Sequence, residues 1–194
     1  MENLPLQQQP QQQNSSENKT ALQKHVEFFD QNNDGIVMPW ETYKGFRDLG
    51  FGIITSTLSA FVINLFLSYP TQDSKIPNPT LPIYIKNIYK GKHTSDSETY
   101  NSDGTINPKK FNQFKEAIRE CTDGKEVITT LSEALKLSES FKHGFDPVGG
   151  TASKAEWTFL WIANGYKLDA KDIEDSYDGT LFENIAKRRA DGNK

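Results

Sequence analysis

The chain has 194 residues with 22 basic and 26 acidic side chains, so its formal net charge is −4. A negative chain with a mean hydropathy of −0.67 is neither a polytopic membrane protein nor a typical nucleic-acid binder, because neutralising phosphates requires a basic surface. The single cysteine, Cys121, excludes an intramolecular disulfide framework and a cysteine-based zinc site.

Residues 1–19 form a glutamine-rich tail of low complexity, which we predict to be disordered because it has little apolar surface to bury. This start lacks the basic and apolar stretches of a secretory signal, so we expect the protein to face the cytosol. Residues 20–48 follow as a first folded unit of two helices. The first helix is capped by Thr20 and carries Leu22, Val26 and Phe29 on one side, and the second runs from about Pro39 to Leu49.

The loop between these two helices matches the EF-hand pattern at each diagnostic position. Side-chain oxygens stand at positions 1, 3 and 5, Gly35 permits the sharp turn at position 6, and a glutamate stands at position 12. Met38 at position 9 has no oxygen, so we expect water to fill that place. The predicted Ca²⁺ ligands are Asp30, Asn32, Asp34, Ile36 through its backbone carbonyl, and Glu41.

A second loop, from Thr99 to Lys110, has the outline of an EF-hand without its chelating ends. An ammonium at the last position, where a carboxylate must chelate, makes calcium binding there improbable. We predict a degenerate partner hand in which Ile106 pairs with Val37 as a short strand; the alternative is a simple Ser-Asp-Gly turn.

A window of 24 residues, from Leu49 to Gln72, contains no charge. At helical spacing it divides into an apolar stripe and a small-and-polar stripe, and a helix of that length reaches about 36 Å, enough to cross a bilayer core. Its serines, threonines and asparagine favour a helix that lies on or dips into a membrane. The apolar stripe is Phe51, Ile54, Leu58, Phe61, Val62, Leu65 and Tyr69, and the other is Gly52, Ser56, Ala60, Asn64 and Ser68.

Four prolines between Pro70 and Pro82 predict a chain of turns, because proline lacks the N–H that a helix needs. Together, residues 49–82 form the predicted membrane-associating segment and proline turn, residues 83–186 a C-terminal helical region, and residues 187–194 a tail. Within that region we predict helices at 108–120, 125–141, 153–163, 169–177 and 181–189, with a loop at 144–150.

The fold class that follows is mainly α: an EF-hand-like helical domain with a degenerate partner hand, a central amphipathic membrane-associating helix and a proline-rich turn. Three histidines are present. His25 and His93 each precede one of the two loops by a similar distance, so they are expected to face one cavity if the loops pair. His143 has no such counterpart.

These features together resemble the caleosins, a family of calcium-binding peroxygenases of lipid droplets. The resemblance covers about residues 20–186 and rests on the segments 20–50, 82–96 and 177–183, together with the uncharged window and its prolines. The proline region from Pro70 to Pro82 is more dispersed than the compact proline knot of the family, so the resemblance does not fix the depth of membrane insertion.

The resemblance implies haem b held by two histidines, which match His25 and His93 here, and bound Ca²⁺. It implies oxygen transfer from fatty acid hydroperoxides to unsaturated fatty acids, on lipid droplets or the endoplasmic reticulum membrane. Either both histidines bind the iron, or one binds and the other moves a proton between the peroxide oxygens. A non-catalytic lipid-droplet coat protein and a soluble calcium buffer are the alternatives, and a homo-oligomer is left open.

Overall fold

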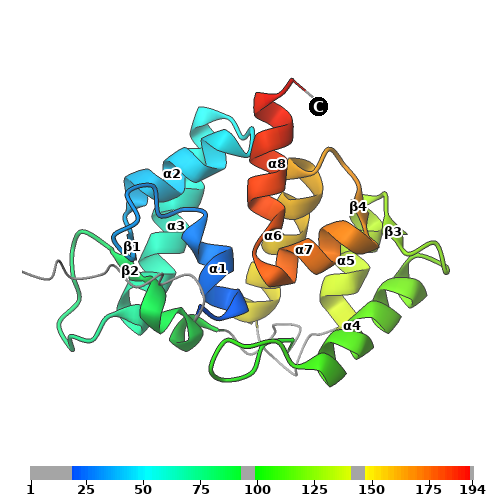
Figure 1. Cartoon of the computed structure of the whole chain (residues 1–194), viewed down its shortest axis with the longest axis horizontal. Coiled ribbons are helices and arrows are strands. Elements are labelled where there is room, and N and C mark those ends of the chain that lie inside the picture. The colour runs from blue at the N-terminus through cyan, green and yellow to red at the C-terminus, as the bar shows by residue number, and fades with distance from the viewer. Residues whose placement is uncertain (1–18, 93–98, 141–146, 193–194) are drawn as a thin grey trace, which may run out of the picture.

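The computed structural model describes residues 19–92, 99–140 and 147–192, and over these residues the chain is mainly α-helical, as predicted (Figure 1). The helices are α1 (Ala21–Glu27), α2 (Pro39–Asp48), α3 (Ile53–Thr71), η2 (Ile85–Gly91, a 3₁₀ helix), α4 (Pro108–Cys121), α5 (Leu131–Ser140), α6 (Pro147–Ala163), α7 (Ala170–Asp178) and α8 (Leu181–Ala190). The strands are β1 (Ile36–Val37), β2 (Ile83–Tyr84), β3 (Val127–Ile128) and β4 (Leu168–Asp169).

Each short strand lies in the connection between two helices, and the strands pair two by two. Strand β1 pairs with β2 and strand β3 with β4, both antiparallel. The described chain is therefore organised as two groups of helix–strand–helix units, one around each strand pair. Figure 1 shows the β1–β2 group on the left with α1, α2 and α3, and the β3–β4 group on the right with α4 and α5.

The predicted pairing of Ile106 with Val37 is wrong. Val37 lies opposite Ile83, whereas Ile106 forms an isolated bridge with Tyr100 inside its own loop. Burial explains the choice, because Val37 and Ile83 are each only 1% exposed and share a small core with Ile85 and Ile88. The loop at 99–110 is thus not the partner of the EF-hand loop, and instead accepts a hydrogen bond at the carbonyl of Gly104 from the N–H of Leu22.

Three predicted helix boundaries also move. Helix α5 begins at Leu131 and not at 125, because Glu126 has a positive φ of 56° and the next two residues form β3. Helix α6 begins within the predicted loop at 144–150, where Pro147 suits a first helical position that needs no N–H. Helix α3 continues through Pro70 to Thr71, whose hydroxyl donates to the carbonyl of Leu67.

Helix α3 buries its small and polar residues and exposes its large apolar ones. Four members of the predicted small stripe are buried, whereas Gly52, just before the helix, is exposed. Six members of the predicted apolar stripe are exposed, and Phe51, which precedes the helix, is buried in the core. The exposed face, called the outer face of α3 below, consists of Ile53, Ile54, Leu58, Phe61, Val62, Leu65, Phe66 and Tyr69. A continuous apolar face of this kind marks an interaction with lipid or protein.

By length and composition, α3 is the one helix in the described residues that qualifies as a candidate membrane span. The packing of α3 indicates whether such a helix would cross a membrane or lie in its surface. Contacts with α2, β2 and η2 cover the inner side of α3, so lipid can reach only its outer face. This one-sided exposure favours a helix that lies in the surface of a membrane over one that crosses it.

Asn64, in the middle of the inner side of α3, joins three other segments. Its amide nitrogen donates to the carbonyls of Val37 and Leu81, at 3.1 and 2.9 Å, and its amide oxygen accepts from the Thr42 hydroxyl at 2.7 Å. Asn64 is fully buried, so these bonds have no water to replace them. One side chain therefore ties α3 to strand β1, helix α2 and the end of the proline turn.

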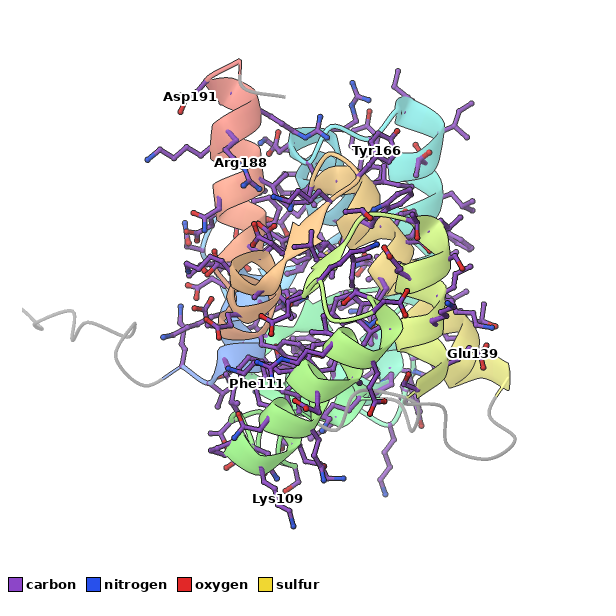
Figure 2. The ribbon with its side chains drawn as sticks, turned by 90° about the vertical axis from the view of Figure 1, so that its right-hand side faces the viewer. Lys109, Phe111, Glu139, Tyr166, Arg188 and Asp191 are labelled. Atoms are coloured by element: carbon purple, nitrogen blue, oxygen red, sulfur yellow. The ribbon has the colours of Figure 1, made fainter. Side chains whose placement is uncertain are left out.

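The larger core lies among the helices of the C-terminal half. It includes Phe114, Ile128, Leu137, Leu168 and Ile173, all 0 to 1% exposed. Figure 2 shows α4 side-on, with Lys109 pointing away from the body and Phe111 directed towards it. Cys121 at the end of α4 is buried, and burial raises the pKa of its thiol. Cys121 therefore contributes to the packing of the larger core.

Replacing Asn64 tests its role as the joint between these segments. Asn64→Ala removes the amide that donates to the carbonyls of Val37 and Leu81, so we expect the free energy of unfolding to fall by about 3 kcal/mol. Urea denaturation in detergent, followed by circular dichroism, measures the change. The control is Thr57→Ala, because the exposed Thr57 hydroxyl bonds only to its own helix; a loss for Asn64→Ala no larger than for this control contradicts the assignment.

Candidate functional site

The loop between α1 and α2 is shaped by its own side-chain oxygens. Asp30 is buried and accepts hydrogen bonds from the backbone N–H groups of Gly35, at 2.8 Å, and Asp34, at 3.2 Å. Asp34 in turn accepts from the N–H of Ile36 at 2.8 Å. Gly35 adopts a φ of +82°, which glycine reaches without strain. The loop is therefore folded around its acidic residues, as an EF-hand loop is.

Glu41, at the start of α2, closes the loop from its other end. Its two carboxylate oxygens accept hydrogen bonds from the N–H groups of Gln31, at 3.1 Å, and Met38, at 2.8 Å. The side chain is fully buried. The bond to Met38 caps the first turn of α2, where N–H groups have no partner within the helix. Glu41 thus holds the beginning and the end of the loop together.

The three carboxylates of this loop have no cationic side chain beside them. Among the described residues, neither Asp30, Asp34 nor Glu41 forms an ion pair with lysine or arginine. Two of these carboxylates are buried, and a buried charge is costly unless it is paired or binds a metal. Each oxygen retains a lone pair beyond its backbone hydrogen bond, so the donor set fits a hard cation such as Ca²⁺.

The side chains are not yet gathered as a closed metal cage. Within the described residues, no three or more His, Cys, Asp or Glu side chains are assembled tightly enough to hold a metal ion. The EF-hand pattern also takes ligands from an amide and a backbone carbonyl, here Asn32 and Ile36. Asn32 is exposed, and its amide nitrogen donates to Asp34. The residues of the loop fit the cation by their chemistry.

His25 lies on α1, before that helix enters the calcium loop. Its Nδ1 lies 2.9 Å from the carbonyl oxygen of Ser176 on α7. The ring also contacts Phe182 on α8, with the ring centroids 4.7 Å apart. No hydrogen bond occupies its Nε2 among the described residues. Within the part of the chain that the structure describes, His25 thus has one nitrogen bonded to a backbone carbonyl and a second nitrogen whose lone pair can bind a metal, the arrangement typical of a metal-binding histidine.

The surroundings keep the His25 ring neutral at pH 7. Burial lowers the pKa of His25 below its ordinary value of 6.5, and this effect outweighs the Ser176 carbonyl and the charge of Glu156, which both raise it. A neutral imidazole has a lone pair for a metal, whereas an imidazolium has none. The Nε2 atom of His25 is therefore suited to bind the iron of a haem.

The second predicted haem ligand, His93, lies outside the described residues, and so does His143. The described residues on either side of the His93 segment are joined to each other, because the Lys92 ammonium donates to the carbonyl of Tyr100. Helix η2, which leads to that segment, packs against α1, the helix of His25. Helix η2 therefore brings the residues that precede the His93 segment close to the helix of His25.

Sequence reasoning did not single out two residues that the structure makes important. Asn64 was one of several small residues in a stripe, although the only amide among serines and alanine could have drawn attention. Ser176 acts through its backbone carbonyl, which leaves no signal in the amino-acid type. The predicted calcium ligands all lie in the loop between α1 and α2, and their binding of calcium stays a prediction.

Comparison with known proteins adds an independent finding. The chain matches the family model described as caleosin related protein over residues 17–186. It is 42% identical over 180 residues to a peroxygenase of Lilium longiflorum, covering 91% of this chain and 74% of that protein. It is 36% identical over 178 residues to probable peroxygenase 4 of Arabidopsis thaliana, covering 90% of this chain and 89% of that protein.

A third similar protein differs in its description. It is the probable inactive peroxygenase-like protein of Arabidopsis thaliana, 29% identical over 150 residues, covering 76% of this chain and 70% of that protein. No solved structure matches the chain.

Removing one negative charge tests the acidic loop. Glu41→Gln keeps the shape of the side chain but removes the charge of the one residue placed for bidentate ligation, so we expect Ca²⁺ affinity to fall at least tenfold in isothermal titration calorimetry. The matched control is Glu116→Gln on the exposed side of α4, which should bind Ca²⁺ like the parent protein. Equal affinities in the two variants contradict the loop as the calcium site.

Proposed function

The chain belongs to the caleosin family, and from this membership we propose that it is a calcium-binding haem peroxygenase that works at a lipid surface. The observation that carries the proposal is the 42% identity with a peroxygenase over 91% of the chain. The similarity to the inactive relative is lower, at 29%, and covers less of the chain. The higher identities to the two proteins named as peroxygenases favour an active enzyme.

Calcium binds in the loop between α1 and α2. Its ligands are the side chains of Asp30, Asn32, Asp34 and Glu41 and the carbonyl of Ile36, with water at position 9. The buried, unpaired carboxylates support this assignment. The ion acts through structure. It binds the loop that begins five residues after His25, and so fixes the end of the helix that carries the candidate haem ligand.

Haem binds through His25 and His93. The free Nε2 of a neutral His25 supports its role as a ligand. When bound, haem supplies the iron at which the O–O bond of a hydroperoxide is cleaved and one oxygen is passed to a second substrate. The products are the alcohol of the hydroperoxide and a hydroxylated or epoxidised fatty acid, so no further reductant is needed.

The protein side chains have separate tasks in this reaction. If one histidine binds the iron, the other is free to move the proton from the oxygen that is transferred to the oxygen that leaves. Phe182 packs against the His25 ring, and Phe28 packs against Phe182, so this side of the ring is apolar. Apolar surroundings limit the access of water to a proton transfer.

The substrates are fatty acids that dissolve in the lipid phase. The outer face of α3 supports contact with that phase, because eight large apolar side chains are exposed on it with no charge between them. We place the protein on lipid droplets or the endoplasmic reticulum membrane, facing the cytosol, with α3 lying in the surface. A structural coat protein shares this face, so its exposure alone does not distinguish the two functions.

An absorption spectrum distinguishes a peroxygenase from a coat protein. Purified protein supplied with haem should show a Soret band and should convert a fatty acid hydroperoxide and oleic acid into an alcohol and an epoxide. His25→Ala and His93→Ala should each abolish the band or the turnover, whereas His143→Ala should retain both. Absence of a Soret band from the parent protein favours the coat protein, and full activity in either of the first two variants removes that histidine from the site.

Charging the outer face of α3 tests the lipid contact. Ile54 and Leu58 are 85% and 62% exposed, so Ile54→Glu with Leu58→Glu leaves the core intact while removing apolar area worth several kcal/mol in lipid. We expect at least about tenfold less protein to float with phospholipid-coated triolein droplets. The control carries the same two charges on α4, as Asn112→Glu with Gln113→Glu; equal flotation of both variants contradicts the assignment.

A further inference from the structure

The proposed function assigns no role to the segment around Tyr177–Gly179. It contributed to the resemblance in sequence, and it forms the end of α7 and the turn into α8. Gly179 closes α7 with a φ of +91°, and its N–H bonds to the carbonyl of Asp175. Helix α7 packs against α1, the helix that carries His25. The turn therefore lies directly beside the candidate haem ligand.

The turn leaves one carbonyl of α7 open to His25. In a continuing helix the N–H of Thr180 would bond to Ser176, but here it bonds to Asp175 at 3.0 Å. The Ser176 carbonyl is thus released from the backbone ladder and lies 2.9 Å from Nδ1 of His25. It belongs to the last turn of the helix, where carbonyls carry a partial negative charge.

The next carbonyl along the chain is occupied by a different donor. The hydroxyl of Tyr100 donates to the carbonyl of Tyr177 at 2.9 Å. Two consecutive carbonyls at the end of α7 therefore have two dedicated partners, His25 and Tyr100. The ring of Tyr177 is itself buried against Phe111 and Phe114, which fixes this end of the helix in place.

Only glycine allows α1 to come this close. A Cβ atom at position 179 would lie 2.6 Å from the backbone nitrogen of His25 and 2.7 Å from the carbonyl carbon of Lys24. These are backbone atoms, so relief requires the two helices to move apart. The missing side chain of Gly179 is therefore a condition for the bond between His25 and Ser176.

We infer that the end of α7 is a positioning element for His25, and this inference rests on the proposed role of His25 as a haem ligand. A carbonyl can only accept, so its bond requires the proton of the neutral imidazole to be on Nδ1. The lone pair then resides on Nε2, ready for iron. A hydrogen bond from the far nitrogen of a metal-bound histidine also fixes the ring orientation and makes the histidine a stronger donor.

The tautomer of His25 in the haem-free protein tests the inference directly. Two-bond ¹H–¹⁵N spectra of the ¹⁵N-labelled full chain should show His25 with its proton on Nδ1, assigned by the loss of that signal in His25→Ala. In Gly179→Ala the helices must separate, so we expect the proton to move largely to Nε2, the tautomer favoured in water. The matched control is Gly124→Ala, whose φ of +80° is equally strained but where a Cβ meets no atom within 4 Å.

The haem-loaded protein supplies a second readout. Gly179→Ala should bind haem about ten to a hundred times more weakly and shift the iron–histidine stretching band in resonance Raman spectra, whereas Gly124→Ala should do neither. A wild-type His25 with its proton on Nε2 overturns the inference even if Gly179→Ala fails to fold. So does an unchanged tautomer in a folded Gly179→Ala. Undiminished haem binding by His25→Ala overturns the proposed ligand role instead, whatever the tautomer.

Discussion

The buried amide of Asn64 is the contact on which the arrangement of the N-terminal half depends. It sits where a charge-free helix, a calcium loop strand and a proline turn converge, and it satisfies a backbone acceptor in two of them. The carbonyl of Leu81 lies in the connection before strand β2, outside the paired residues, so a side chain supplies its donor. The other buried residues of α3 are three serines, Ala60 and Thr71, and the half-buried Ile63 and Leu67 pack against the small core beside them.

The same contact links the loop between α1 and α2 to the helix with the apolar outer face. Thr42, which donates to Asn64, follows Glu41 directly in the chain, and Val37 belongs to the loop strand. On the other side, α1 leads from the loop back to His25, whose ring is held by α7 and α8. The loop, the candidate haem ligand and the lipid-facing helix are therefore linked through short, direct contacts.

Local patterns in the sequence predict this fold better than long-range pairings do. The helical period predicts the two faces of α3, and the spacing of acidic residues predicts a calcium loop because all its proposed ligands lie between Asp30 and Glu41. The partner of β1 was assigned wrongly, since pairing depends on which distant segment buries its apolar side chains best, and Ile83 does so better than Ile106. The acceptor for His25 could not be predicted, because it is a backbone atom released by a turn.

In most helices of soluble proteins the apolar side faces the core, whereas in α3 the apolar side is exposed. The buried polar side chains of Asn64 and Thr71 are hydrogen-bonded inside the protein, and the large apolar side chains of the outer face point outwards, so the helix needs no lipid in order to form. An exposed apolar face of this size favours contact between separate chains in water. If lipid covers the outer face of α3, as proposed, protein made in excess of the lipid surface would be folded yet prone to self-association, and the lipid supply would limit how much of it stays dispersed.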